Sequence, residues 1–72
     1  MESTRTPAYR RFLARLRAAR EEAGLTQVQA AKRLRKSQTF VSKSESGDRR
    51  VDVIELKAFA RLYKKPLDYF LG

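Results

Sequence analysis

Residues 26–47, TQVQAAKRLRKSQTFVSKSESG, constrain the fold most, because they contain two helix-start signals close together. The Thr26 hydroxyl can accept a hydrogen bond from a free backbone N–H, and Gln29, three residues on, can reach back, which is the pattern of a capping box. This box predicts a helix that ends near Leu34. Ser37 can cap a second helix that ends at Gly47. The segment therefore predicts two short helices joined by a tight turn.

The second of these helices has an unusually polar side. When its residues are placed 100° apart, one arc holds an amide, three hydroxyl groups and an ammonium group and no apolar side chain. The residues of this arc are Gln38, Thr39, Ser42, Lys43 and Ser46. Such groups hydrogen-bond base edges and phosphates in a major groove, which is wide enough to admit a helix. The pattern indicates a helix-turn-helix unit that reads DNA.

A wider set of residues carries a family resemblance. The sequence REEAGLTQ at residues 20–27 is followed by paired alanines at 30–31, Ser-Gln at 37–38, Val-Ser at 41–42 and Glu45-x-Gly47. In these positions the chain resembles the Cro and lambda-repressor-like (Xre) helix-turn-helix family of bacterial and phage regulators, over roughly residues 12–71. The resemblance implies an all-α, five-helix domain with a central helix-turn-helix.

The chain departs from the family pattern at three positions. Arg35 stands in the turn where the family usually has glycine, so that an arginine must take or avoid the left-handed conformation there. Ser44 stands where a large apolar or aromatic residue is common, and Lys57 where an apolar residue is frequent.

The rest of the sequence supplies three further helices around this unit. Apolar residues at helical spacing predict a first helix over about 8–23, which Gly24 ends. Asp52 and Glu55 predict a second capping box, and Pro66 suits the start of a last short helix. The expected core stripe of the fourth helix is Val53, Leu56, Phe59, Ala60 and Tyr63. Residues 1–7 are predicted to be a flexible basic arm, and residues 8–72 a single helix-turn-helix DNA-binding domain.

Composition and charge agree with a nucleic-acid partner. The 72 residues carry 17 Lys and Arg against 8 Asp and Glu, a net charge of +9, and the basic residues are concentrated in and just after the helix-turn-helix. A polyanion such as double-stranded DNA is the obvious partner for this distribution. The chain has no cysteine and no histidine, which excludes Cys/His zinc fingers and imidazole-based catalysis. We therefore expect no metal, no cofactor and no enzymatic activity.

The interface residues can be assigned from this arrangement. Gln38 is the strongest candidate for base contact, because a Gln amide can pair with N6 and N7 of adenine. The full set expected at bases is Gln38, Thr39, Ser42 and Lys43. The set expected at phosphates is Gln27, as the family resemblance implies, with Ser37, Arg49 and Arg50, and with Arg10 and Arg11 as weaker candidates. The plainer alternative for each of these residues is a solvated polar surface.

Two further groups are expected to serve the structure. The resemblance implies that Glu45, on the inner side of the recognition helix, forms a structural ion pair with Arg20. The apolar residues Leu62, Leu67, Phe70 and Leu71 exceed what a small monomer needs to bury. They are therefore predicted to form the interface of a homodimer.

Together these features predict a sequence-specific transcriptional regulator, most simply a repressor, that acts as a homodimer on a two-fold-related operator. Two alternatives stay open: an antitoxin-type protein that neutralises a partner protein and autoregulates its promoter, and a nonspecific nucleic-acid coat. No apolar run is long enough for a membrane span or a signal peptide, so a cytoplasmic location is expected.

Overall fold

We describe the fold from a computed structural model, which describes residues 6–72. The five helices are α1 (Pro7–Glu22), α2 (Gln27–Leu34), α3 (Gln38–Ser46), α4 (Val53–Tyr63) and α5 (Leu67–Leu71). Every regular element in this range is helical, which confirms the all-α, five-helix prediction. The first helix begins one residue earlier than expected, with Thr6 as its N-cap and Pro7 in its first turn. Residues 1–5 of the predicted arm lie outside the described residues.

The helix starts follow the capping signals of the sequence. The Thr26 hydroxyl accepts from the Gln29 N–H at 3.1 Å, and the Gln29 amide oxygen accepts from the Thr26 N–H at 2.9 Å. Asp52 and Glu55 form the same reciprocal pair at the start of α4. Ser37 caps α3 by accepting from the backbone N–H of Phe40. These bonds satisfy N–H groups that a helix start otherwise leaves unpaired, and so they fix where each helix begins.

Two helices end on left-handed residues that are not glycine. Arg35 closes α2 with a φ of 59°, and Lys64 closes α4 with the same φ. This conformation costs an L-residue about 1–2 kcal/mol relative to right-handed backbone. Arg35 therefore adopts the left-handed conformation at the position where the family usually has glycine. The turn keeps its geometry, and the backbone of Arg35 is strained.

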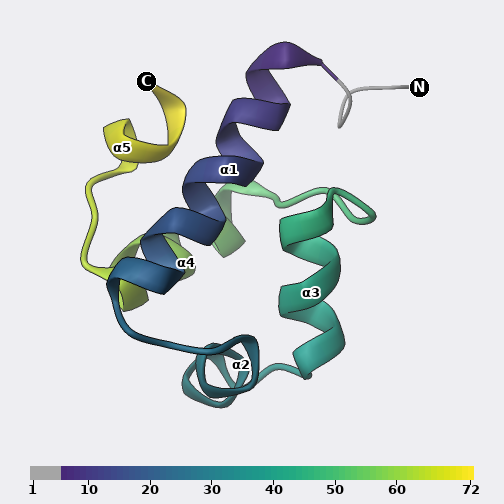
Figure 1. The fold of residues 1–72 in the computed structure, drawn as a ribbon, viewed down its shortest axis with the longest axis vertical. Coiled ribbons are helices and arrows are strands. Elements are labelled where there is room, and N and C mark those ends of the chain that lie inside the picture. Colours follow the sequence, from purple (N-terminus) through teal and green to yellow (C-terminus); the bar gives the residue numbers. More distant parts are fainter. Residues whose placement is uncertain (1–5) are drawn as a thin grey trace.

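The core lies where α1 meets the other helices. Figure 1 shows α1 crossing the molecule, with α5 beside its N-terminal half and α3 at one edge. Leu16, Phe59 and Phe70 are fully or almost fully buried there, and α2 packs against both α3 and α4. The predicted core stripe of α4 is wrong at Val53, which is 66% exposed. Val53 is the first residue of α4, and the inward face of the helix begins one turn later, at Leu56.

Candidate nucleic-acid interface

The two helices of the helix-turn-helix pack closely through small side chains. Ala30 and Ala31 of α2 are buried, and Val41 of α3 is fully buried. Methyl groups at these positions let the backbones of α2 and α3 approach, while the turn at residues 35–37 reverses the chain. This packing leaves the opposite side of α3 free of the other helices at the edge of the molecule (Figure 1).

The predicted reading face occupies that free side. Gln38, Thr39 and Lys43 are exposed, whereas Ser42 is partly covered. Ser42 borders a hollow of about 440 Å³ that is lined also by Arg17 and Gln27, where α1, α2 and α3 meet. The structure thus brings four polar side chains of α3 to one surface, with Ser42 the least accessible of them.

A buried ion pair joins α1 to α3. The Nε of Arg20 donates to one carboxylate oxygen of Glu45 at 2.6 Å, and a terminal nitrogen donates to the other at 3.1 Å. The two side chains are only 10% and 5% exposed. A second terminal nitrogen of Arg20 donates to the Leu25 carbonyl at 2.8 Å. The hydrogen bond to Glu45 raises the pKa of the Arg20 guanidinium above its ordinary value.

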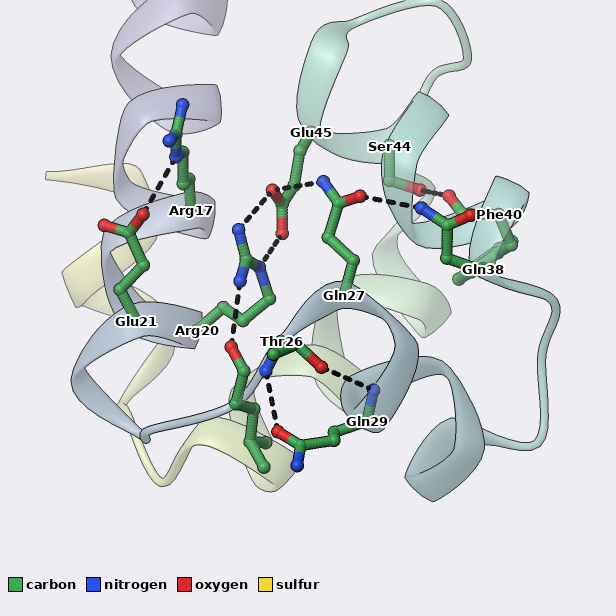
Figure 2. Close-up of polar contacts among 11 residues, drawn as sticks. Arg17, Arg20, Glu21, Thr26, Gln27, Gln29, Gln38, Phe40, Ser44 and Glu45 are labelled. Carbon is green, nitrogen blue, oxygen red and sulfur yellow. Dashed lines mark hydrogen bonds and ion pairs between the residues drawn. The ribbon is translucent and has the colours of Figure 1, made fainter.

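A chain of hydrogen bonds extends from this ion pair to the surface of the recognition helix. Figure 2 shows Gln27 between Glu45 and Gln38. The Gln27 amide nitrogen donates to Glu45 at 3.1 Å, and the Gln27 amide oxygen accepts from the Gln38 amide nitrogen at 2.9 Å. Arg20, Glu45, Gln27 and Gln38 form one continuous connection, which we call the polar relay. It links the domain interior to the first residue of α3.

The polar relay fixes which way each amide points. An ionised carboxylate can only accept hydrogen bonds, so the Gln27 amide must turn its nitrogen towards Glu45 and its oxygen towards Gln38. Gln38 then has to donate to Gln27. The amide oxygen of Gln38 and its second N–H are left for a partner outside the protein. That pair of groups matches the acceptor and donor edge of adenine in the major groove.

The sequence predicts a phosphate contact for Gln27, and the polar relay is not among the contacts that it predicts. In the structure Gln27 is half-buried and both ends of its amide are occupied by protein partners. A signal was present, because a glutamine stands at the first position of each of the two helices. The pattern alone could not show that their side chains would meet.

The sequence predicts a phosphate contact for Arg49, but in the structure protein groups bind its side chain. Its guanidinium makes two hydrogen bonds of 2.8 Å with the two carboxylate oxygens of Glu55, and it lies 4.5 Å from the centre of the Phe40 ring. The hydrogen bonds with Arg49 hold the pKa of the Glu55 carboxyl below its ordinary value, and the Asp52 N–H acts in the same direction. Arg50, next in the chain, is exposed.

Phe40 is anchored inwards. Its ring stacks on Phe59 of the core, with centroids 5.9 Å apart and an angle of 12° between the planes. Its role is therefore packing at the edge of the core. Ser37 is exposed at the start of α3 with its oxygen already accepting the capping bond, and Arg10 and Arg11 are exposed on the first turns of α1.

The predicted dimer residues fall into three environments. Phe70 is 1% exposed and packs edge-on against Phe12, so the single chain already buries it. Its assignment to a dimer interface is wrong, because a side chain enclosed by its own core cannot contact a second chain. Leu62 is half-buried against the core, whereas Leu67 and Leu71 are 39% and 67% exposed. Of the four, only these last two present much apolar surface to solvent.

Comparisons with known proteins agree with this geometry. A family model described as helix-turn-helix matches residues 16–70, most of the chain, and includes all of α2, α3 and α4. A comparison with curated proteins found no match. Within residues 6–72, no helix is long and apolar enough to cross a membrane. The match, the five helices and the exposed polar face of α3 place the chain in the Xre and lambda-repressor-like helix-turn-helix family of DNA-binding transcriptional regulators.

Proposed function

We propose that the protein is a sequence-specific repressor that binds a two-fold-related operator as a homodimer. The polar relay is the observation that carries this proposal. A Gln side chain on a helix surface ordinarily samples several rotamers, but Gln38 is held by Gln27, which is held in turn by the buried Glu45. A reading group that is oriented before DNA arrives loses less entropy on binding and discriminates better between bases.

Base readout then falls to the exposed face of α3. Gln38 offers its free oxygen to the N6 amino group of adenine and its free N–H to N7, a bidentate contact worth about 1–3 kcal/mol of discrimination. Thr39 and Lys43 are exposed on the same face and can reach neighbouring bases or phosphates. Ser42, which is partly covered, has room only for a partner that enters the hollow beside it.

Phosphate contacts would flank this face. Arg50 is exposed just beyond α3, and Arg10 and Arg11 are exposed on α1. Ser37 and the start of α2 offer hydroxyl and backbone N–H groups that favour an anion. Gln27 can add a phosphate contact only by sharing an amide that the polar relay already uses.

A dimer would double the reading surface. Leu67 and Leu71 of α5 are exposed, and two copies of the domain joined there could present their α3 helices to successive major grooves, about 34 Å apart. A dimer seated on a promoter would exclude polymerase. Repression is thus the simplest regulatory outcome for a domain of this size.

Selection of bound duplexes from a random pool tests the proposal. We expect a two-fold-symmetric consensus with an adenine in each half-site, and loss of preference at that base pair for Gln38→Ala. A selected pool as diverse as the starting pool would reject sequence-specific binding. A consensus without symmetry would reject the homodimer.

One observation favours a second function, that of a protein that also binds another protein. Val53 and Ile54, at the start of α4, are 66% and 68% exposed and lie outside the reading face. Coexpression with the product of an adjacent reading frame tests it. A stoichiometric complex that Ile54→Glu abolishes would support a partner-binding role, and independent purification of the two products would reject it.

A further inference from the structure

One of the contacts that hold the recognition helix on the core lies near the start of the helix, at Phe40. The Phe40 ring contacts the Phe59 ring of the core, with centroids 5.9 Å apart, and two cations lie over it, the Arg49 guanidinium at 4.5 Å and the Lys36 ammonium at 5.2 Å from its centre. A guanidinium at this distance from an aromatic ring is attracted by its π-electrons. Phe40 is only two residues after Gln38, so the position of this ring sets the position of the reading residue.

Arg49 is fixed in turn by the start of α4. Two hydrogen bonds of 2.8 Å join its guanidinium to Glu55 in a bidentate arrangement, which restricts the plane of the group as well as its position. Glu55 is itself oriented, because one of its oxygens accepts from the Asp52 N–H in the capping box at 3.1 Å. The side chains of Arg49 and Glu55 are 33% and 20% exposed, so the pair is partly shielded from water.

Ser44 makes room for this arrangement. Its side chain is completely buried, and its hydroxyl donates to the Phe40 carbonyl at 2.7 Å while lying 3.4 Å from an Arg49 nitrogen. The family commonly has a large apolar residue at this position, which would anchor α3 by itself. Here a small residue stands at that position, and the guanidinium of Arg49 packs beside it. Arg49 therefore takes over part of the anchoring that Ser44 is too small to supply.

We propose that Arg49 is a positioning residue for base recognition, which acts through Phe40 and depends on Glu55, and that it is not a phosphate ligand. This inference rests on the proposed function, since it explains how α3 is held at the angle that Gln38 needs. It assigns the specificity of the protein partly to a residue that does not touch DNA. It also makes Glu55, an acidic residue of α4, a contributor to DNA recognition.

The two roles for Arg49 predict opposite results for two conservative changes. Arg49→Lys keeps the positive charge but loses the bidentate fork and the flat surface that stacks on Phe40. Glu55→Gln keeps the capping box, which Gln also supports, but removes the charge that holds Arg49. A phosphate ligand would tolerate Arg49→Lys and would bind DNA as well or better after Glu55→Gln. A positioning residue would be impaired by both changes.

The experiment measures binding to the selected operator and to a random duplex over a range of salt concentrations, at a temperature where each variant is folded by circular dichroism. We expect Arg49→Lys and Glu55→Gln each to lower the ratio of operator affinity to random-duplex affinity by about fivefold or more. This is the lower end of the discrimination that one bidentate base contact provides. The salt dependence should stay that of the parent, because no phosphate contact is lost. Arg50→Lys is the matched control, and it should leave the ratio unchanged.

Amide hydrogen exchange on the free protein tests the anchoring without DNA. In both variants protection should fall in α3 while α1 keeps the protection of the parent. Parental discrimination in Arg49→Lys, or tighter binding to both duplexes in Glu55→Gln, would overturn the inference. A parent protein that does not discriminate between operator and random duplex would instead overturn the proposed function, so the two failures are distinguishable.

Discussion

Arg20 and Glu45, which are 25 positions apart in the chain, form a bidentate ion pair whose side chains are at most 10% exposed. The pair joins the last turn of α1 to the last turn of α3. Because Glu45 also accepts from Gln27, which accepts from Gln38, the same carboxylate stabilises the fold and orients the reading residue (Figure 2). In the proposed function, fold stability and base recognition are therefore coupled through Glu45.

The first prediction concerns this carboxylate. Glu45→Ala should lower the free energy of unfolding by roughly 3–5 kcal/mol, because it leaves the Arg20 guanidinium buried without its counter-charge. A domain of this size has only about that much stability in total, so the variant should be largely unfolded at 37 °C. Chemical denaturation followed by circular dichroism measures the change.

The exposed pair of Arg17 and Glu21 is the matched control, since its side chains are 67% and 54% exposed. Glu21→Ala should cost no more than about 0.5 kcal/mol. Replacing Arg20 and Glu45 together with apolar residues should be milder than Glu45→Ala alone. Equal decreases in the free energy of unfolding for Glu45→Ala and Glu21→Ala would show that the buried pair stabilises the fold no more than the exposed pair does.

The second prediction concerns the left-handed residues at the helix ends. Arg35→Gly and Lys64→Gly should each raise the free energy of unfolding by about 0.5–1 kcal/mol, because glycine adopts a φ of 59° without the clash of a Cβ atom. Lys64 lies outside the helix-turn-helix, so its change isolates the backbone effect from any effect on DNA binding. A lower melting temperature for Lys64→Gly would contradict the assigned strain.

The third prediction concerns acid stability. Hydrogen bonds from Arg49 lower the pKa of Glu55 in the folded state, so the stabilisation from its charge is present above the unfolded pKa, about 4.3. It is lost as the pH falls through the lower folded value. Lys36, whose charge also favours the ionised carboxyl, adds to the same effect.

Glu55→Gln removes the titrating group and keeps the capping box. The difference in unfolding free energy between parent and variant should be constant above about pH 5 and should shrink below about pH 4.3. Urea denaturation at a series of pH values measures it. A difference in unfolding free energy that does not change between pH 6 and pH 3 would show that the charge of Glu55 does not stabilise the fold.

The fourth prediction concerns self-association. Leu71→Glu should weaken or abolish the proposed dimer, because it places a carboxylate on the exposed apolar surface of α5. Ile54→Glu is the matched control, since Ile54 is 68% exposed against 67% for Leu71 but lies on α4. Sedimentation equilibrium of each variant, free and on a symmetric duplex, decides the matter. A parent that is monomeric in both conditions would rule out the homodimer.

The parts of the fold that could be predicted from the sequence are those set by local chemistry. The capping boxes at Thr26 and Asp52, the cap at Ser37 and the break at Gly24 each depend on residues within one turn of each other. The buried stripe of α4 was predicted one turn too far towards its start, because helical periodicity does not show where a neighbouring helix ends. The sequence does not separate Phe70 from the exposed leucines of α5 for a related reason, because an apolar side chain can be covered by its own chain or by a second one.

The candidate site was predictable in its residues and not in its connections. The spacing of Gln38, Thr39 and Lys43 placed them on one exposed face of α3. The contacts that hold this face, Gln27 with Gln38 and Arg49 with Glu55 and Phe40, depend on where side chains end after the helices have packed. Arg49 and Arg50 are equivalent in the sequence. Only the folded structure shows that Arg49 pairs with Glu55 while Arg50 is exposed.

We propose that α3 reads bases through Gln38, whereas Arg50, just beyond this helix, contacts only the DNA backbone. The most direct measurement compares Gln38→Ala and Arg50→Ala with the parent on the selected operator and on a random duplex. Gln38→Ala should lose about 1–3 kcal/mol on the operator with little change on the random duplex. Arg50→Ala should weaken both similarly and lower the salt slope by about one unit. An unchanged ratio of operator to random affinity in Gln38→Ala would contradict the account.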